Sequence, residues 1–417
     1  MKKIILLVID GLADRPSVTL NDQTPLEVAS MPSVESLMPN SLIGLMDNSL
    51  GLSEPTSDLA VLSLLGYDPT RIKVSRSILD VVAEGLPFSD GELALHCNFA
   101  TLADDGVTLL DRRVNRTLSH GEAKALEEFI NENVEIENAS FIFRHMVDYM
   151  GVLVIKHNDG WLDAAISDVD PWRADQPKIL KECRPLTNSI EARRACKSVN
   201  EFVKQTYEKL RNHPVNRYRR EVGMLEANVI ITRQAGNEIP KGIIGLRDKY
   251  NLRSAVQARL PTERGIAKLL GMEVLDLPRI SPHENLGAYY AERARIIARR
   301  IKQYDMIYSH FDEVDDAGHD GDALKKKRIL EIWDRYFLAE LISRIDLQEV
   351  VLCITGDHAT VCELKAHTAD PIPLLIYGGP SKHESRATRF CERECSRSSF
   401  KIKGTQLLEI LINASKS

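Results

Sequence analysis

The sequence predicts an α/β fold, in which a sheet core is flanked by helices and interrupted by a smaller inserted α+β domain. The first observation is a continuous apolar run, Ile4 to Ile9, that ends at Asp10. Such runs are typical of strands covered on both faces of a parallel sheet. Two later runs, Met306 to Tyr308 and Val350 to Ile354, are also followed by polar side chains. Because ligands of open α/β sheets bind beyond the carboxyl ends of strands, both ends of the chain are predicted to form one catalytic domain.

The middle of the chain has a different pattern. Strands are expected at Ala94 to Thr101, Val107 to Leu110 and Gly151 to Ile155, around a helix at His120 to Asn133. Apolar side chains at three- and four-residue spacing then predict a long amphipathic helix from Glu191 to Leu210. A strand and two helices restore the α/β alternation, at Ala227 to Thr232, Gly265 to Leu270 and Leu286 to Lys302. We therefore predict a discontinuous domain of residues 1–85 and 185–417 and an inserted α+β cap of residues 86–184.

The composition of the chain indicates which classes of binding partner are expected. The 417 residues carry 54 Lys plus Arg against 60 Asp plus Glu, a net charge of -6, and so lack the basic excess that nonspecific nucleic-acid binding needs. The apolar run Ile4 to Ile9 is far shorter than the roughly 20 residues of a membrane helix and too short for a secretory signal. Seven scattered cysteines do not suit a disulfide framework, so reduced thiols are expected. We expect a cytoplasmic protein that binds a small molecule and neither nucleic acid nor membrane.

The sharpest local signal is the run Asp315 to Asp320, followed later by Asp357, His358 and His367. Asp315 and His319 are four residues apart and would share one face of a helical turn. A single pair of this kind is more often a capped turn or a surface helix. Asp357 and His358 at a strand end, with His367 nine residues later, add convergent ligands. Mixed carboxylate and imidazole donors suit zinc or manganese.

A hydroxyl near a predicted helix start has two readings. Ser57 precedes the apolar run Val61 to Leu65. It, or Thr56, would in the simplest reading cap the helix. In the functional reading, a hydroxyl at a helix N-terminus and beside a divalent metal loses its proton easily and attacks phosphorus. Sequence neighbourhood alone does not choose between them.

Arginines supply candidates for anion binding. Arg112, Arg113 and Arg116 would form a fork for phosphate or carboxylate, because guanidinium donates paired hydrogen bonds to such groups; a solvated turn is the alternative. Further candidates are Arg76, Arg259 and Arg264. The chain has neither a Walker A run nor a Gly-x-Gly-x-x-Gly after a strand.

Taken in order, a series of segments resembles the cofactor-independent phosphoglycerate mutases of archaeal type, within the alkaline phosphatase superfamily, over nearly the whole chain. The main segments are Val8 to Pro16, Thr24 to Glu27, Ser57-Asp58, Leu65 to Pro69, Cys97 to Thr101, Asp111 to Arg113, Asp168 to Pro171, His213 to Asn216, Asp315 to Asp322 and Thr355 to Pro373. The resemblance implies an alkaline-phosphatase-like core and two divalent ions, Mn²⁺ or Zn²⁺. By this resemblance one ion is held by Asp10, Ser57, Asp357 and His358, and the other by Asp315, His319 and His367.

The resemblance also implies a glycolytic isomerase that moves a phosphoryl group on a small phosphorylated acid through a phosphoserine intermediate. Its catalytic residues would be Ser57, Arg264 and Asp111. Its substrate-binding residues would be Arg76, Arg112, Arg113, Arg116 and His96.

Departures from the family pattern fall at substrate-binding positions. Ser75 and Ser77 flank Arg76 where the family commonly has glycines, and His96 stands where it commonly has Arg. Arg264 and Asp312 stand where it commonly has Lys. Guanidinium keeps the charge of Lys but does not exchange protons at neutral pH. Two alternatives therefore stay open: a metal-dependent phosphatase or phosphodiesterase acting on another metabolite, and a catalytically inactive metal-binding regulatory protein. Neither the substrate nor the oligomeric state follows from the sequence.

Overall fold

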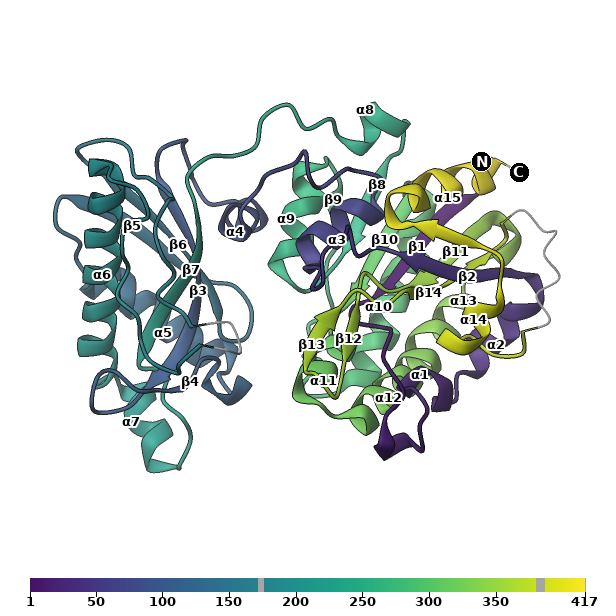
Figure 1. Ribbon diagram of the computed structural model, residues 1–417, viewed down its shortest axis with the longest axis horizontal. Coiled ribbons are helices and arrows are strands. Elements are labelled where there is room, and N and C mark those ends of the chain that lie inside the picture. The colour runs from purple at the N-terminus through teal and green to yellow at the C-terminus, as the bar shows by residue number, and fades with distance from the viewer. Residues whose placement is uncertain (172–175, 380–386, 417) are drawn as a thin grey trace. The chain divides into compact units, whose positions relative to one another are not determined.

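The chain folds as two units (Figure 1), seen in a computed structural model that describes residues 1–171, 176–379 and 387–416. The first unit combines Met1–Ile72 with Ile243–Ser417, and the second is Lys73–Gly242. The two ends of the chain lie together in the first unit, where the amide of Lys2 donates to the carbonyl of Ser415 at 2.7 Å. Within the described residues, no helix has the length and apolar character needed to span a membrane.

The first unit is built on an eight-stranded mixed sheet with the order β15-β2-β14-β11-β1-β10-β8-β9. Strand β1 runs parallel to β10 and β11, and β14 runs antiparallel to β11 and β2. A separate two-stranded ribbon joins β12 and β13. The bounds are β1 (Lys3–Ile9), β2 (Ser41–Asp47), β8 (Ser254–Gln257), β9 (Glu273–Val274), β10 (Met306–Phe311), β11 (Val350–Thr355), β12 (Ala359–Val361), β13 (Ala366–Thr368), β14 (Ile372–Tyr377) and β15 (Lys401–Lys403).

Helices cover both faces of this sheet, which explains its uninterrupted apolar strands. On one face Ile5, Leu7 and Ile9 of β1 join a core with Trp333 and Phe337. The other face carries α15, which packs on β1 and β11. The helices are α1 (Pro25–Val28), α2 (Pro32–Leu37), α3 (Ser57–Leu64), α8 (Leu246–Tyr250), α9 (Pro261–Leu269), α10 (Leu286–Arg300), α11 (Glu313–Asp320), α12 (Ala323–Ile332), the π-helix η5 (Trp333–Leu338), α13 (Ala339–Ile342), α14 (Glu392–Arg397) and α15 (Leu407–Lys416).

The second unit is an antiparallel sheet sandwiched by helices. Strand β3 is its centre and pairs with β4, β6 and β7, while β5 pairs with β6. One face packs on α5 and α6, and the other on α4. The bounds are β3 (Leu93–Leu102), β4 (Leu109–Asp111), β5 (Ala139–His145), β6 (Met150–His157), β7 (Val229–Gly236), α4 (Arg76–Glu84), α5 (His120–Asn133), α6 (Ile190–Leu210) and α7 (Pro214–Glu221).

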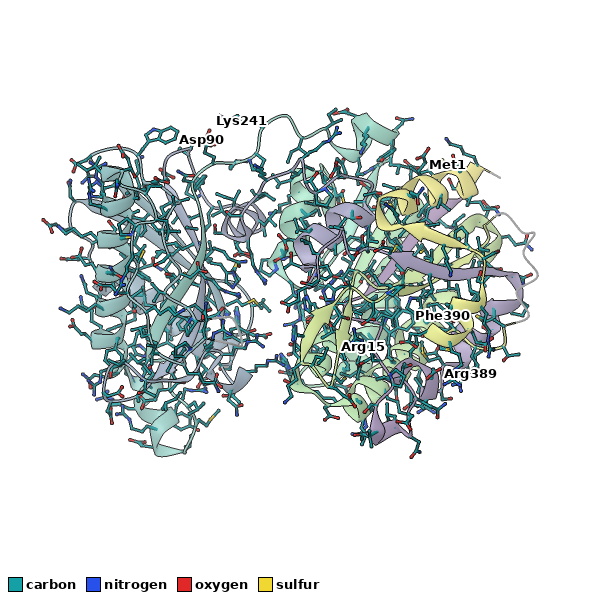
Figure 2. All side chains as sticks on the ribbon, in the orientation of Figure 1. Met1, Arg15, Asp90, Lys241, Arg389 and Phe390 are labelled. Atoms are coloured by element: carbon teal, nitrogen blue, oxygen red, sulfur yellow. The ribbon has the colours of Figure 1, made fainter. Side chains whose placement is uncertain are left out.

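The predicted α/β class with an inserted α+β unit is confirmed. The inserted unit is longer at both ends than the predicted residues 86–184. The second unit begins at Lys73, because α4 packs on the sheet face opposite α5 and α6. It continues to Gly242, because β7 pairs with β3 and α6 packs on β7. An ion pair between Lys241 and Asp90, at 2.6 Å, ties the last part of the unit to the segment before β3 (Figure 2).

A buried lysine fastens the loop after β1 to α12. Lys326 is fully buried, and its ammonium donates to the Asp14 carboxylate at 2.9 Å and to the carbonyls of Ala13 and Thr360 at 3.1 and 2.7 Å. All three of its hydrogens are thereby used. Lys326 therefore joins three segments that are far apart in the sequence.

Replacing Lys326→Met should lower the free energy of unfolding by about 3–5 kcal/mol, because the buried Asp14 charge would lose its partner. Urea unfolding followed by circular dichroism measures this. The matched control is Lys325→Met, since Lys325 is exposed and its ion pair with Asp320 lies at the surface. Its effect should stay within about 0.5 kcal/mol. Equal effects of the two substitutions would contradict this role.

Candidate active site

Carboxylates from two parallel strands meet at one edge of the first unit's sheet. Asp10 follows β1, and Asp357 and His358 follow β11. His358 Nε2 lies 3.1 Å from Asp10 Oδ1 and 3.3 Å from Asp357 Oδ2. Gly11 has a φ of +63°, and a Cβ there would lie 2.6 Å from the Thr360 hydroxyl, so only glycine lets the two loops approach this closely.

The ribbon and α11 bring a second set of ligands. Asp315 and His319 lie on one face of α11, and His367 lies on β13. His319 Nε2 is 3.0 Å from His367 Nε2 and 3.4 Å from Asp315 Oδ2. The ring of His367 stacks on that of His358 with centroids 3.7 Å apart. The two sets thus meet at His358.

Backbone carbonyls fix the orientation of the histidines. The Nδ1 atom of His319 lies 3.0 Å from the carbonyl of Lys365, and that of His367 lies 2.8 Å from the carbonyl of Pro55. With Nδ1–H donating to a carbonyl, the lone pair of each ring is on Nε2. Both Nε2 atoms therefore face the carboxylates as ligand atoms, which is the usual arrangement around a bound metal.

Ser57 is the first residue of α3, and its hydroxyl is turned toward these groups. Its Oγ lies 3.1 Å from His358 Nε2. The preceding N-cap residue, Thr56, makes no side-chain capping bond. The simple capping interpretation of Thr56 and Ser57 is therefore wrong, and the hydroxyl is placed beside the predicted ligands.

The chemistry of the cluster fits cations. Two groups of described residues have ligand atoms within 4.8 Å of one another: Asp10, Asp357 and His358, and Asp315, His358 and His367. Among described atoms, the buried oxygens Asp10 Oδ1 and Asp357 Oδ2 have no hydrogen-bond partner. A buried carboxylate oxygen without a donor is costly, and a divalent cation would satisfy it. The residues present thus fit two metal ions.

The same crowding shifts the pKa of each group. Burial and the neighbouring Asp10 raise the pKa of Asp357 to about 6. Burial favours neutral His358, yet Asp357 and Asp10 outweigh it and raise the His358 pKa to about 9. Burial and Asp315 disfavour the Asp10 carboxylate, but His358 and His310 hold its pKa below the usual value. These opposed shifts show that the charges of Asp10, Asp357 and His358 depend strongly on one another.

Two further residues support the cluster and were not singled out from the sequence. The Thr360 hydroxyl donates to Asp315 Oδ1 at 2.5 Å. His310, at the end of β10, lies 3.1 Å from Asp10 Oδ2 and 2.5 Å from the Tyr308 hydroxyl. The polar end of β10 was visible in the sequence, but only the register of β10 beside β1 shows that His310 contacts Asp10.

Two arginines of the first unit that were predicted to bind anions differ in their burial and in their contacts. Arg264 is partly buried on α9, a helix that packs on α3. Arg259, also a sequence candidate, is buried and forms an ion pair with Asp312. The acid at position 312, where the resembled family commonly has Lys, is thus neutralised by Arg259 inside this chain.

In the second unit, a left-handed turn carries the arginine run. Val114, Asn115 and Arg116 all have φ between 51° and 54°. Such a run costs roughly 1–2 kcal/mol per non-glycine residue. Asp111 Oδ1 holds the turn by accepting from the amides of Arg113 and Asn115 at 2.7 and 2.9 Å. The geometry therefore gives Asp111, predicted as catalytic, a role in holding this turn.

An arginine cluster forms around one buried acid. Arg112 donates to both oxygens of Asp170, at 2.5 and 2.6 Å, and Arg233 lies 3.4 Å from the same carboxylate. Arg76 is near enough to Arg233 that burial and Arg76 together lower the Arg233 pKa to about 10. Two guanidinium groups thus face a single carboxylate, with Arg76 close to Arg233, and positive charge of this kind is suited to an anion. Arg233 and Asp170 were not predicted as site residues.

The other residues predicted to bind substrate, Arg113, Arg116 and His96, differ in their contacts. Arg113 lies over the ring of Tyr149 at 5.8 Å, and Arg116 ends the left-handed turn. His96 is fully buried and its Nδ1 lies 2.7 Å from Asp80 Oδ2. Burial lowers the pKa of His96 well below its usual value, so the ring is neutral. The ring of His96 is thus enclosed within the unit, and direct binding of substrate by His96 stays a prediction.

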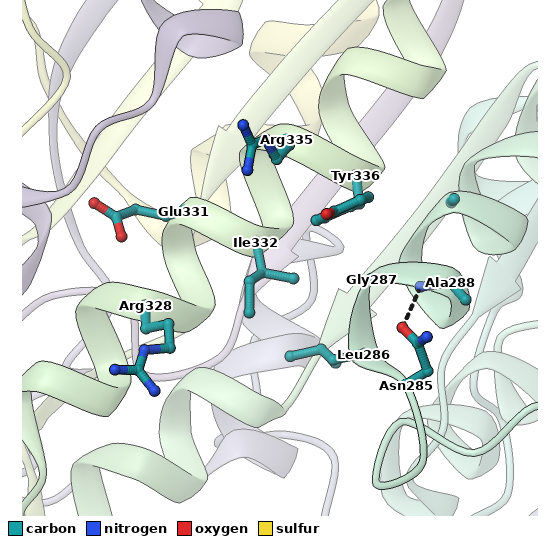
Figure 3. Close-up of a pocket in the computed structure, with 10 residues that line it drawn as sticks. Asn285, Leu286, Gly287, Ala288, Arg328, Glu331, Ile332, Arg335 and Tyr336 are labelled. Carbon is teal, nitrogen blue, oxygen red and sulfur yellow. Dashed lines mark hydrogen bonds between the residues drawn. The ribbon is translucent and has the colours of Figure 1, made fainter.

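A separate cavity of about 700 Å³ lies in the first unit between the start of α10 and the helices α12 and η5 (Figure 3). It is lined by Asn285, Leu286, Gly287, Ala288, Ala291, Arg328, Glu331, Ile332, Arg335 and Tyr336. No predicted site residue is in this lining, so the cavity is distinct from the cluster around Asp10 and His358.

Comparison with known proteins identifies the family. A family profile described as 2,3-bisphosphoglycerate-independent phosphoglycerate mutase matches residues 39–216. The chain is 35% identical over 415 residues to such a mutase from Methanocaldococcus jannaschii, with 99% of this chain and 97% of the relative covered. It is 34% identical over 413 residues to another from Methanopyrus kandleri, with 98% and 96% covered. A solved cofactor-independent phosphoglycerate mutase from Thermoplasma acidophilum superposes with a TM-score of 0.60 at 27% identity, with 100% of both chains covered. The resemblance inferred from the sequence is confirmed, and the chain belongs to the family of 2,3-bisphosphoglycerate-independent phosphoglycerate mutases.

Proposed function

We propose that this protein interconverts 3-phosphoglycerate and 2-phosphoglycerate through a phosphoserine at Ser57. The observation that carries the proposal is the position of the Ser57 hydroxyl, 3.1 Å from His358 Nε2 and at the start of α3. A helix N-terminus favours negative charge on that oxygen, which makes it a better nucleophile. The family membership supports the choice of substrate.

Two divalent ions, Mn²⁺ or Zn²⁺, would stabilise the serine oxyanion and the charge on the phosphoryl oxygens when bound. We assign one to Asp10, Ser57, Asp357 and His358 and the other to Asp315, His319 and His367. The protein's own contribution is orientation: the carbonyls of Lys365 and Pro55 direct the two histidine Nε2 atoms, and Thr360 holds Asp315.

Recognition of the substrate's acidic groups is assigned to the second unit. Arg112 and Arg233 both contact Asp170, and Arg76 lies close enough to Arg233 to lower its pKa. Arg113, Arg116 and Asp111 belong to the left-handed turn beside Arg112. The arrangement is suited to an acid that carries both a carboxylate and a phosphate. Arg264 is assigned to stabilise charge on the phosphoryl group and not to transfer protons.

A mutase and a phosphatase differ in the fate of the phosphoserine, so one assay separates them. Purified protein with Mn²⁺ is incubated with 3-phosphoglycerate while enolase converts any 2-phosphoglycerate formed, and inorganic phosphate is measured in parallel. A mutase gives enolase product with little phosphate. Phosphate release without enolase product would reject the mutase in favour of a phosphatase, and neither product from metal-loaded protein would reject this substrate.

Replacing Ser57→Ala should reduce mutase activity by at least roughly 10⁴-fold, because the nucleophile is lost. Mass spectrometry of wild-type protein after incubation with substrate should show one added phosphoryl group on the peptide that contains Ser57, and the variant should show none. Thr56→Ala is the matched control, since Thr56 is exposed and makes no side-chain capping bond. An active Ser57→Ala protein would contradict the assignment.

Metal affinity should rise with pH between about 6 and about 9. His358, whose pKa is raised to about 9, is protonated below that pH and must lose its proton at Nε2 to bind a cation. Each released proton gives a tenfold gain per pH unit; Asp357, whose pKa is about 6, adds a proton only below that value. Titration calorimetry with Mn²⁺ in buffers of different ionisation enthalpy measures the protons released.

The control for this titration is His120→Gln, on a histidine of the second unit, which should leave the pH dependence unchanged. Affinity that is independent of pH, with no proton release, would contradict the placement of His358 in the metal centre.

A further inference from the structure

Two buried thiols of the second unit lie in contact. Cys183 and Cys196 have relative exposures of 3% and 4%, and their Sγ atoms are 2.9 Å apart. This separation is shorter than a van der Waals contact between two sulfurs and less than about 1 Å longer than a disulfide bond. Neither residue takes part in the proposed mechanism.

Hydrogen bonds hold the main chain of Cys183 against the helix that carries Cys196. Asn200, one turn beyond Cys196 on α6, accepts from the amide of Cys183 at 2.8 Å and donates to its carbonyl at 3.0 Å. Both main-chain groups of Cys183 are thereby held to the helix that carries Cys196. The main chain of Cys183 is thus held beside Cys196, within reach of the contact between the two sulfurs.

We propose that Cys183 and Cys196 form a reversible redox modification site whose oxidant is a peroxide. One thiol reduces hydrogen peroxide, forming a sulfenic acid and one water. The second thiol then attacks the sulfenic sulfur, so that an S–S bond forms, the S–O bond breaks and a second water leaves with the thiol proton. Two electrons pass from the pair of sulfurs to the peroxide oxygens, and a dithiol returns them on reduction.

The surroundings control how fast this reaction proceeds. Glu182 and Arg184, on either side of Cys183, are exposed, so a molecule as small as peroxide has only a short path to the sulfurs. Burial raises the pKa of both thiols, which keeps the reactive thiolate scarce at neutral pH. Oxidation is therefore slow at neutral pH and accelerates as the pH rises.

The cross-link would stiffen the segment that carries Asp170. Arg184 and Ser167 are paired through two hydrogen bonds of 2.9 Å, and the amides of Val169 and Asp170 both donate to the carbonyl of Thr232 on β7. Asp170 in turn orients Arg112. If Arg112 binds substrate, which rests on the proposed function, the disulfide pre-organises it by fixing its support to α6.

The first test needs only the wild-type chain. After treatment with hydrogen peroxide, free thiols are blocked and the protein is digested with trypsin, which does not cleave between Arg184 and Pro185. The expected product is the peptide 182–193 joined to the peptide 195–197, lighter than the two separate peptides by two hydrogens and split by dithiothreitol. Absence of this product, with all seven cysteines still alkylated, would overturn the proposal.

Two variants act as matched controls. Cys391→Ser removes another buried cysteine and should leave the linked peptide unchanged. Cys196→Ser should abolish it, and a peroxide-induced link from Cys183 to a different cysteine in that variant would show that the pairing is not specific.

The functional consequence is measured separately. Oxidised protein should have a KM for 3-phosphoglycerate at least two-fold lower than reduced protein, with kcat unchanged and with the difference lost in Cys196→Ser. Equal KM values in cross-linked and reduced protein would overturn the link to Arg112. Absence of mutase activity in both forms would reject the proposed function while the linked peptide still established the modification site.

Discussion

Mutual repulsion among three clustered carboxylates, of which Asp10 and Asp357 are buried, is the constraint on which the site depends. Asp10, Asp315 and Asp357 are brought together because β1, β10 and β11 are parallel neighbours whose carboxyl ends meet at one edge of the sheet. Burial and proximity disfavour charge on these groups and raise the pKa of Asp357, whereas the nearby histidines hold the pKa values of Asp10 and Asp315 below their usual range. His358 relieves part of that cost, while Asp10 Oδ1 and Asp357 Oδ2 form no hydrogen bond with any residue that the structure describes. Divalent cations are well suited to neutralise these carboxylates and to coordinate their oxygens.

The surrounding residues make sense as supports for that cluster. The carbonyls of Lys365 and Pro55 set which nitrogen of His319 and His367 faces the acids. Gly11 permits the close approach of the loop after β1 to the ribbon, and Lys326 ties the same loop to α12. These contacts hold ligands from distant parts of the sequence in place, and pre-organisation of this kind is what a metal centre requires. The second unit has the opposite charge pattern, with guanidinium groups in excess around Asp170.

Much of this centre could be predicted from the sequence, because its ligands are local signals at strand ends. Asp10 and Asp357 each follow an apolar run, and Asp315 and His319 share a helix face. The structure places all of these near one another. Long-range register was not predictable: His310 is adjacent to Asp10 only because β10 pairs with β1. The resemblance supplied the position of Ser57, since its sequence neighbourhood alone favoured a helix cap.

The second unit was harder to predict, because its features depend on tertiary contacts. The inserted unit was predicted too short, because no local sequence pattern shows that β7 pairs with β3. Arg233 lies in unremarkable sequence and Asp170 in a segment singled out only for the family resemblance, and only the convergence of Arg112 and Arg233 on Asp170 makes them a site. The pairing of His96 with Asp80 was not predictable, because an imidazole on an apolar strand gives no sign of a buried partner. Contact between Cys183 and Cys196 is likewise invisible without the packing of the loop on α6.

The most direct test of the central claim is anomalous diffraction from crystals of this protein grown with Mn²⁺, measured at the manganese edge. The account predicts two peaks in the first unit, one contacting Asp10, Asp357 and His358 and the other contacting Asp315, His319 and His367. Manganese bound elsewhere, with both of these positions empty, would contradict it.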